Sequence, residues 1–213
     1  MSKIITSFGI DDVPFEDTRD FDNANKGFIA TRKDPIIKNK RGKVVMDLNR
    51  FDFMKAEAPT TVNASLWRQG QLNSLHGLFE VCEGIYQIRG FDLANMTLVA
   101  TEEGWIIIDV LTSEEVAAAA MELVAEHLGE RPIKAVIITH SHIDHFGGIN
   151  GVISEESVAA GEVDIIAPEG FYESAISENI LAGNAMTRRS MYMFGTLLPT
   201  CLLYTSPSPR DRG

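Results

Sequence analysis

An uninterrupted apolar run at residues 135–138, Ala-Val-Ile-Ile, is the feature that most constrains how this chain folds. Such a run is typical of a strand that is covered on both faces by helices or by a second sheet. A helical pattern precedes it over residues 112–128, where Thr112 and Glu115 form a capping box and Gly129 follows as a C-cap. A buried strand that follows an amphipathic helix predicts an α/β (α+β) fold.

The segments on either side of this unit also show strand and helix patterns. Upstream, short runs rich in β-branched and aromatic residues predict a meander of strands at 79–82, 85–89, 96–99 and 105–108. Downstream, the pattern predicts a short helix that begins at Ser154 or Glu155, a strand at 165–167, and a helix from Pro168 to about Leu181. The alternation indicates a sheet with helices packed on it.

Four side chains of metal-ligand type follow the apolar run directly, in the sequence His140-Ser141-His142-Ile143-Asp144-His145. Side chains two residues apart in an extended segment share a face, so His140 and His142 can chelate one cation through neutral imidazoles. Asp144 and His145 are adjacent and project differently, so two metals bridged by water use the four side chains more naturally than one tetrahedral ion does. Carboxylate and imidazole without a nearby cysteine favour zinc, with manganese or iron as alternatives.

Other residues near the cluster have supporting or ordinary roles. Asp109 closes the predicted strand before the helix, and we expect it to orient a ligand histidine through a hydrogen bond, the alternative being a turn residue or helix cap. Gly147 and Gly148 follow the cluster and are expected to let the backbone turn sharply. His76 and His127 are isolated in the sequence, so we interpret them as ordinary surface or core histidines.

Charge and cysteine content exclude several classes of protein. With 19 basic and 30 acidic residues the net charge is −11, which disfavours binding to nucleic acid or to an anionic membrane. No apolar run approaches the roughly 20 residues that a membrane span needs. Cys82 and Cys201 form neither a disulfide framework nor a thiolate zinc cluster. No signal-peptide core is evident at the N-terminus, so we expect a cytoplasmic location.

The cluster, with an aspartate closing the strand before it, resembles the metal motif of the metallo-β-lactamase superfamily. The resemblance extends from about residue 25 to 199 and is to the alkylsulfatase branch, whose members hydrolyse dodecyl sulfate and related sulfate esters. The metal motif alone indicates only the superfamily, whereas four flanking stretches are more specific. They are TVNASLWRQ (61–69), GIYQIRGFDLANMT (84–97), EHLGERP (126–132) and APEGF (167–171).

The resemblance implies an αββα sandwich with a dinuclear zinc site, of which this chain carries only the N-terminal part. His140 and His142 are then expected to hold one Zn²⁺, and Asp144 and His145 the other, with an alkyl sulfate as substrate. A homodimer is implied for the complete protein. Arg188 and Arg189 are weaker candidates for binding the sulfate, because surface or structural arginines are the commoner case.

We expect three parts in the chain: an N-terminal extension packed on the domain (1–78), the N-terminal part of a metallo-β-lactamase-like domain (79–199), and a foreign or disordered Pro/Ser/Arg tail (200–213). A dinuclear site needs about three protein ligands per metal, and the cluster supplies four in all. We therefore expect an inactive fragment. The later carboxylates, Glu178 among them, lie on predicted helices or turns and are not expected to be ligands.

Two other functions stay open on the sequence alone. A barrel-type amidohydrolase also begins its metal site with His-x-His at a strand end, but normally without an Asp-His and Gly-Gly directly after it. A non-catalytic binding or interaction protein that keeps half a metal site is the second alternative. Metal content and sulfatase activity, measured on the same preparation, distinguish these alternative functions.

Overall fold

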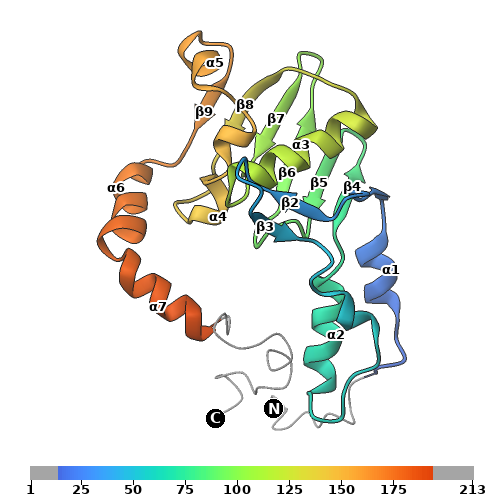
Figure 1. The fold of residues 1–213 in the computed structure, drawn as a ribbon. Coiled ribbons are helices and arrows are strands. Elements are labelled where there is room, and N and C mark those ends of the chain that lie inside the picture. The colour runs from blue at the N-terminus through green and yellow to red at the C-terminus, as the bar shows by residue number, and fades with distance from the viewer. Residues whose placement is uncertain (1–13, 194–213) are drawn as a thin grey trace, which may run out of the picture.

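The computed structural model describes residues 14–193, and its main feature is a seven-stranded sheet in the order β1-β4-β5-β6-β7-β8-β9 (Figure 1). The strands are Phe28–Ala30, Gly77–Cys82, Ile85–Arg89, Met96–Ala100, Trp105–Ile108, Ile133–Ile137 and Asp164–Ile166. Pairs from β1 through β7 are antiparallel, whereas β7–β8 and β8–β9 are parallel. The carboxyl ends of the last three strands therefore meet at one end of the sheet, where open α/β sheets bind ligands.

Helix α3 (Glu114–Leu128) lies across one face of this sheet and forms the core with it (Figure 1). Alternate strand residues such as Leu98, Trp105 and Ile107 are buried in that core. Their neighbours on the opposite face, Val99 and Ile106 among them, are only partly buried. The run at 135–138 shows the same difference, with Val136 and Ile138 buried and Ala135 and Ile137 only partly buried, so the expectation that it is covered on both faces is wrong for the described residues.

The N-terminal cap of α3 differs from the predicted capping box by one residue. Ser113, not Thr112, is the N-cap, and its hydroxyl accepts a hydrogen bond from the Val116 amide at 3.3 Å. Thr112 instead donates its amide and its hydroxyl to the Asp92 carboxylate, each at 2.8 Å. This carboxylate holds the loop before α3, which is why the helix starts one residue later.

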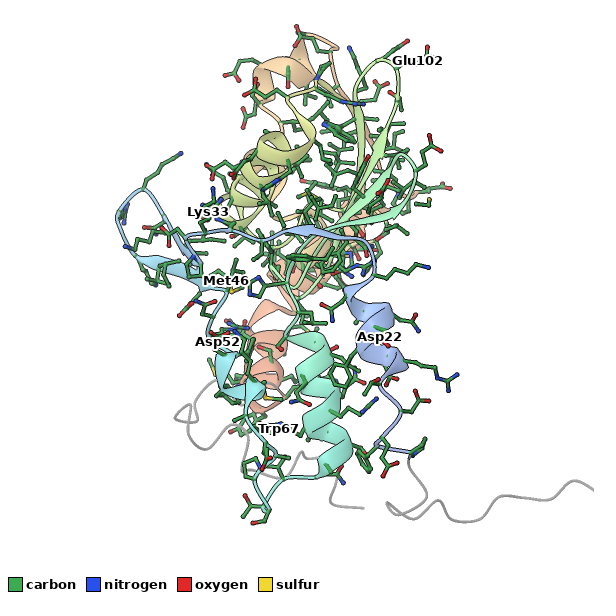
Figure 2. The ribbon with its side chains drawn as sticks, turned by 90° about the vertical axis from the view of Figure 1, so that its right-hand side faces the viewer. Asp22, Lys33, Met46, Asp52, Trp67 and Glu102 are labelled. Atoms are coloured by element: carbon green, nitrogen blue, oxygen red, sulfur yellow. The ribbon has the colours of Figure 1, made fainter. Side chains whose placement is uncertain are left out.

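Residues 14–78 contain more regular structure than the sequence predicted. They form α1 (Arg19–Asn25), β1, the two-stranded sheet of β2 (Ile36–Lys38) and β3 (Val44–Asp47), the 3-10 turn η2 (Asp52–Lys55) and α2 (Ala64–Asn73). β1 is an edge strand of the main sheet, and Ile37 and Leu48 are buried in the core with α3. Figure 2 shows this part from the side, with Asp22 on α1 and Trp67 on α2 below the sheet.

Beyond β8 the chain forms short helices around β9: α4 (Ile143–Phe146), η3 (Ile149–Gly151), α5 (Glu155–Ala159), α6 (Phe171–Ile176), the π-helical turn η4 (Ser177–Leu181) and α7 (Gly183–Met193). The helix predicted from Pro168 begins only at Phe171, because Gly170 before it is left-handed at φ +73°. The predicted tail at 200–213 lies outside the described residues. Within residues 14–193 no helix has the length and apolar content to cross a membrane.

Candidate metal centre

The predicted ligands lie at the end of the sheet where the parallel strands β7 and β8 finish. The histidine loop, which we define as residues 139–146, follows β8 and contains the short helix α4. Asp109 follows β7, and its amide donates to the Ile137 carbonyl at 2.9 Å. Because β7 and β8 are parallel, the loop and Asp109 emerge side by side.

Within the histidine loop the four ligand-type side chains form two pairs. Nε2 of His140 lies 3.0 Å from Nδ1 of His142, and Nε2 of His145 lies 3.3 Å from Oδ2 of Asp144. The His140 and His145 rings bring the pairs together, with centroids 4.0 Å apart. Two ligands on a tetrahedral zinc, each about 2.1 Å from the metal, are about 3.4 Å from each other. Each pair thus has the chemistry and the spacing of half a zinc coordination sphere.

The pairs do not complete either coordination sphere. Among residues 14–193, no group of three or more His, Cys, Asp or Glu side chains is arranged to hold one ion. A tetrahedral zinc takes three protein ligands and a water in catalytic sites. The described residues therefore fit a dinuclear zinc centre as two ligands at each of two positions, and further ligands are needed.

Asp109 is a buried carboxylate that accepts several hydrogen bonds from the histidine loop. Its side chain accepts hydrogen bonds from the Thr139 amide at 2.8 Å and from the Thr139 hydroxyl at 2.8 and 3.0 Å. Nδ1 of His145 lies 2.7 Å from its Oδ2. Asp109 is only 7% exposed and has a left-handed backbone, φ 58°, a conformation that aspartate tolerates better than most residues.

Nδ1 of His140 and Nδ1 of His145, the ring nitrogens that point away from the neighbouring ligand, each have a hydrogen-bond partner. Thr139 Oγ1 lies 2.9 Å from Nδ1 of His140, and since this hydroxyl donates to Asp109 it accepts from the imidazole. His145 donates from Nδ1 to Asp109 directly. Both arrangements leave the lone pair on Nε2, which faces the neighbouring ligand, as a metal-binding histidine requires.

Gly147 and Gly148 serve close packing rather than the sharp turn that the sequence predicted. Their φ angles, −63° and −85°, are accessible to any residue. A Cβ on Gly148, however, would lie 2.1 Å from the Val110 carbonyl oxygen and 2.8 Å from Cβ of Ala117. Backbone hydrogen bonds from Gly148 to Leu111 and from Val110 to His145, each 2.9 Å, join the two loops where these glycines let them touch.

The remaining candidates lie away from the two pairs. His76 is half-buried, its Nδ1 lies 2.7 Å from the Thr31 hydroxyl, and burial lowers its pKa. His127 is exposed in the last turn of α3. Arg188 and Arg189 are exposed on α7, and among the described contacts no hydrogen bond or ion pair joins them to the histidine loop.

Sequence reasoning missed two residues of the site, Thr139 and Glu178. Thr139 stands directly between the buried strand and His140, which is the signal that identifies it. Glu178 lies on a predicted helical segment and is not expected to be a ligand, yet its Oε2 accepts from the Ser141 hydroxyl at 3.3 Å and lies 3.9 Å from Nε2 of His142. Nothing in the local sequence indicates that the chain returns to the loop at that point.

Comparison with known proteins shows which family this chain resembles. The model of the metallo-beta-lactamase superfamily matches residues 89–205. A linear primary-alkylsulfatase from a Pseudomonas species is 50% identical over 190 residues, which are 88% of this chain and 28% of that protein. An alkyl/aryl-sulfatase from Saccharomyces cerevisiae is 48% identical over 188 residues, 88% of this chain and 29% of that protein.

A solved structure agrees with these sequence relatives. The stereoselective inverting sec-alkylsulfatase Pisa1 from a Pseudomonas species superposes with a TM-score of 0.83 at 49% identity, over 89% of this chain and 30% of that one. The chain thus spans less than a third of the relatives named here. The sheet has two free ends, β1 and β9, so the barrel alternative is wrong for the described residues, whereas the predicted α/β fold and family resemblance are confirmed. This chain belongs to the metallo-beta-lactamase superfamily.

Proposed function

We propose that the complete protein hydrolyses alkyl sulfate esters at a dinuclear zinc centre to which this chain contributes His140, His142, Asp144 and His145. The observation that carries the proposal is the pair geometry of the histidine loop, with donor separations of 3.0 and 3.3 Å at the carboxyl ends of two parallel strands. The alkylsulfatase relatives supply the substrate class.

The acidic character of the chain does not oppose an anionic substrate. Charges farther away than a Debye length of about 8 Å are screened at physiological salt, so the overall charge acts weakly on a sulfate bound in the site. Bound metal ions supply local positive charge that polarises the ester. The part of this chain is to hold the ligands in place: Asp109 and Thr139 fix the imidazoles of His140 and His145 with their Nε2 atoms toward the site.

The ligands that complete the two coordination spheres lie, in this proposal, outside residues 14–193. The described residues supply two ligands per position, and about three per zinc are needed. The 213-residue chain alone is therefore expected to hold zinc weakly and to be inactive toward dodecyl sulfate. Homodimerisation of the complete protein and a cytoplasmic location stay predictions.

The test is substitution of one ligand in the complete protein, His142→Ala, with His127→Ala as the control. Both remove an imidazole, but His127 is exposed at the end of α3. We expect about two zinc ions per chain by elemental analysis, loss of dodecyl sulfate hydrolysis in His142→Ala with the circular dichroism spectrum kept, and full activity in His127→Ala. Near-native turnover of His142→Ala contradicts the ligand assignment.

The same preparation separates the enzyme from a non-catalytic protein. A complete protein that binds two zinc ions but releases no alcohol from dodecyl sulfate favours the binding or interaction alternative. One zinc ion or none after reconstitution contradicts the dinuclear site itself.

A further inference from the structure

The C-terminal helices of the described chain contact the histidine loop, although they bury none of their own residues. We call the segment from α6 through α7, Phe171–Met193, the arm, and Figure 1 shows it leading away from the sheet. The arm meets the loop at two places. The ring of Phe171 packs edge-on against Phe146 at 5.2 Å, and Glu178 approaches Ser141 and His142.

Glu178 lies in the π-helical turn η4, between α6 and α7. Such turns are rare and occur often at functional sites. Its side chain is 39% exposed, and Oε2 is the atom that both accepts from the Ser141 hydroxyl at 3.3 Å and faces Nε2 of His142 at 3.9 Å. Glu173, on α6 of the same arm, is exposed and has no described contact with the loop.

The two ring nitrogens of His142 face different partners. Nδ1 lies 3.0 Å from Nε2 of His140, on the side where the first ligand pair converges, and Nε2 faces Glu178. A neutral imidazole carries one N–H and one lone pair. A carboxylate next to Nε2 favours the tautomer with its proton there, which leaves the lone pair on Nδ1 for a metal.

The other two histidines of the loop already show this arrangement. His140 has the Thr139 hydroxyl behind its outer nitrogen, and His145 has Asp109. His142 is the remaining one, and Glu178 stands on its outer side. Its 3.9 Å separation is longer than a hydrogen bond, so a hydrogen bond between the two requires the partly exposed Glu178 side chain to move closer by about 1 Å.

We propose that Glu178 is a positioning residue for the metal centre: it accepts a hydrogen bond from Nε2–H of His142, favours the tautomer that presents Nδ1 to a metal, and links the arm to the ligand loop. This inference rests on the proposed function, because it needs a metal at the His140–His142 pair. In this arrangement Asp109 orients ligands from the sheet and Glu178 orients one from the arm.

The experiment compares Glu178→Ala, Glu178→Gln and the matched control Glu173→Ala in the 213-residue chain. Zinc affinity is measured by competition with a chromogenic chelator, and the exchange of the His142 Nε2–H proton in zinc-loaded protein by 1H–15N NMR. Loss of an outer hydrogen-bond partner commonly lowers metal affinity by about 10- to 100-fold. We expect a loss of at least about tenfold in Glu178→Ala, and less than about threefold in Glu178→Gln, whose amide oxygen still accepts. Glu173→Ala is expected to match the unsubstituted chain.

The Nε2–H proton of His142 gives a readout that a merely structural role would not move. In the zinc-loaded chain we expect the hydrogen bond to residue 178 to protect this proton from exchange with water in the unsubstituted protein and in Glu178→Gln, and we expect rapid exchange in Glu178→Ala. Unchanged zinc affinity and unchanged proton exchange in Glu178→Ala overturn the inference, and so does a Glu178→Gln variant as weak as Glu178→Ala, which indicates direct ligation. If the unsubstituted chain binds zinc and Glu178→Ala matches it, only the inference fails; if the unsubstituted chain binds no zinc, the metal site assigned to this chain fails together with the inference.

Discussion

Replacing Asp109 tests how far the histidine loop depends on one buried carboxylate. Asp109→Ala removes the carboxylate that accepts three hydrogen bonds. They come from the amide of Thr139, the hydroxyl of Thr139 and Nδ1 of His145. Because Thr139 is exposed and His145 is partly exposed, water replaces part of the lost partner, and each lost hydrogen bond costs about 1 kcal/mol. Alanine also tolerates the left-handed backbone at φ 58° less well than aspartate, by about 1 kcal/mol. Together these effects predict a fall of about 3–5 kcal/mol in the free energy of unfolding.

Asp109→Asn separates the charge from the shape. Asparagine keeps the left-handed backbone and one acceptor for the Thr139 amide, but it presents no second acceptor to His145. Since a hydrogen bond to a charged group contributes about 1.5–3 kcal/mol, we expect a loss in that range, smaller than in the alanine variant. Zinc affinity is expected to fall about 10- to 100-fold in both variants, because the His145 ring loses its orientation.

The assay is urea unfolding of the 213-residue chain in EDTA, followed by tryptophan fluorescence. Trp105 reports on the core, since it is 1% exposed. Metal-free conditions keep the stability measurement independent of zinc, and an unchanged dependence on urea shows that the transition is the same one. An alanine variant within about 1 kcal/mol of the unsubstituted chain refutes the reasoning, as does an asparagine variant that is the less stable of the two.

Two further substitutions test the packing and the pH dependence of the fold. Gly148→Ala is expected to lower the free energy of unfolding by about 3 kcal/mol, because its Cβ would lie 2.1 Å from the Val110 carbonyl oxygen. Gly183→Ala is the control and is expected to change stability by less than about 1 kcal/mol, since nothing lies within 4 Å of its added Cβ; equal effects in urea unfolding contradict the close-packing argument. Burial lowers the pKa of His76 in the folded chain, so the unfolded chain binds more protons, and stability is expected to fall as the pH drops below about 6.5. His76→Gln is expected to weaken that dependence and His127→Gln to leave it unchanged, and thermal melts between pH 5 and 8 that show no such difference contradict the assignment.

The sheet was predictable where strands are long or strongly apolar. The pattern places the strands at 85–89 and 105–108 with the bounds that the structure shows, and it places the others within two residues. The short strands β1, β2 and β3 were missed, since three or four residues carry too little pattern and their pairing depends on distant partners. Helix α2 was missed as well, although Asn63 caps it by accepting from the amides of Ser65 and Leu66.

The candidate site was predictable where its residues are close in sequence. The histidine cluster and Asp109 follow adjacent strands, and the parallel pairing of those strands brings them together. Glu178 was set aside because its approach to Ser141 depends on a path of more than thirty residues through α5, β9 and α6. Local patterns predict the elements along such a path, but not the direction in which each one leaves the next.

The strand order of the main sheet has a consequence for the order in which the site is made. From β4 to β9, each strand lies beside its neighbour in the chain, and only β1 pairs across a long interval. The antiparallel pairs from β4 to β7 close small loops and form quickly, whereas the parallel pairs β7–β8 and β8–β9 enclose longer connections and form later. A chain that leaves the ribosome from its N-terminus can therefore add strands one at a time, with Asp109 already synthesised when the histidines emerge. During synthesis the acceptor Asp109 is therefore made before the imidazoles that it orients.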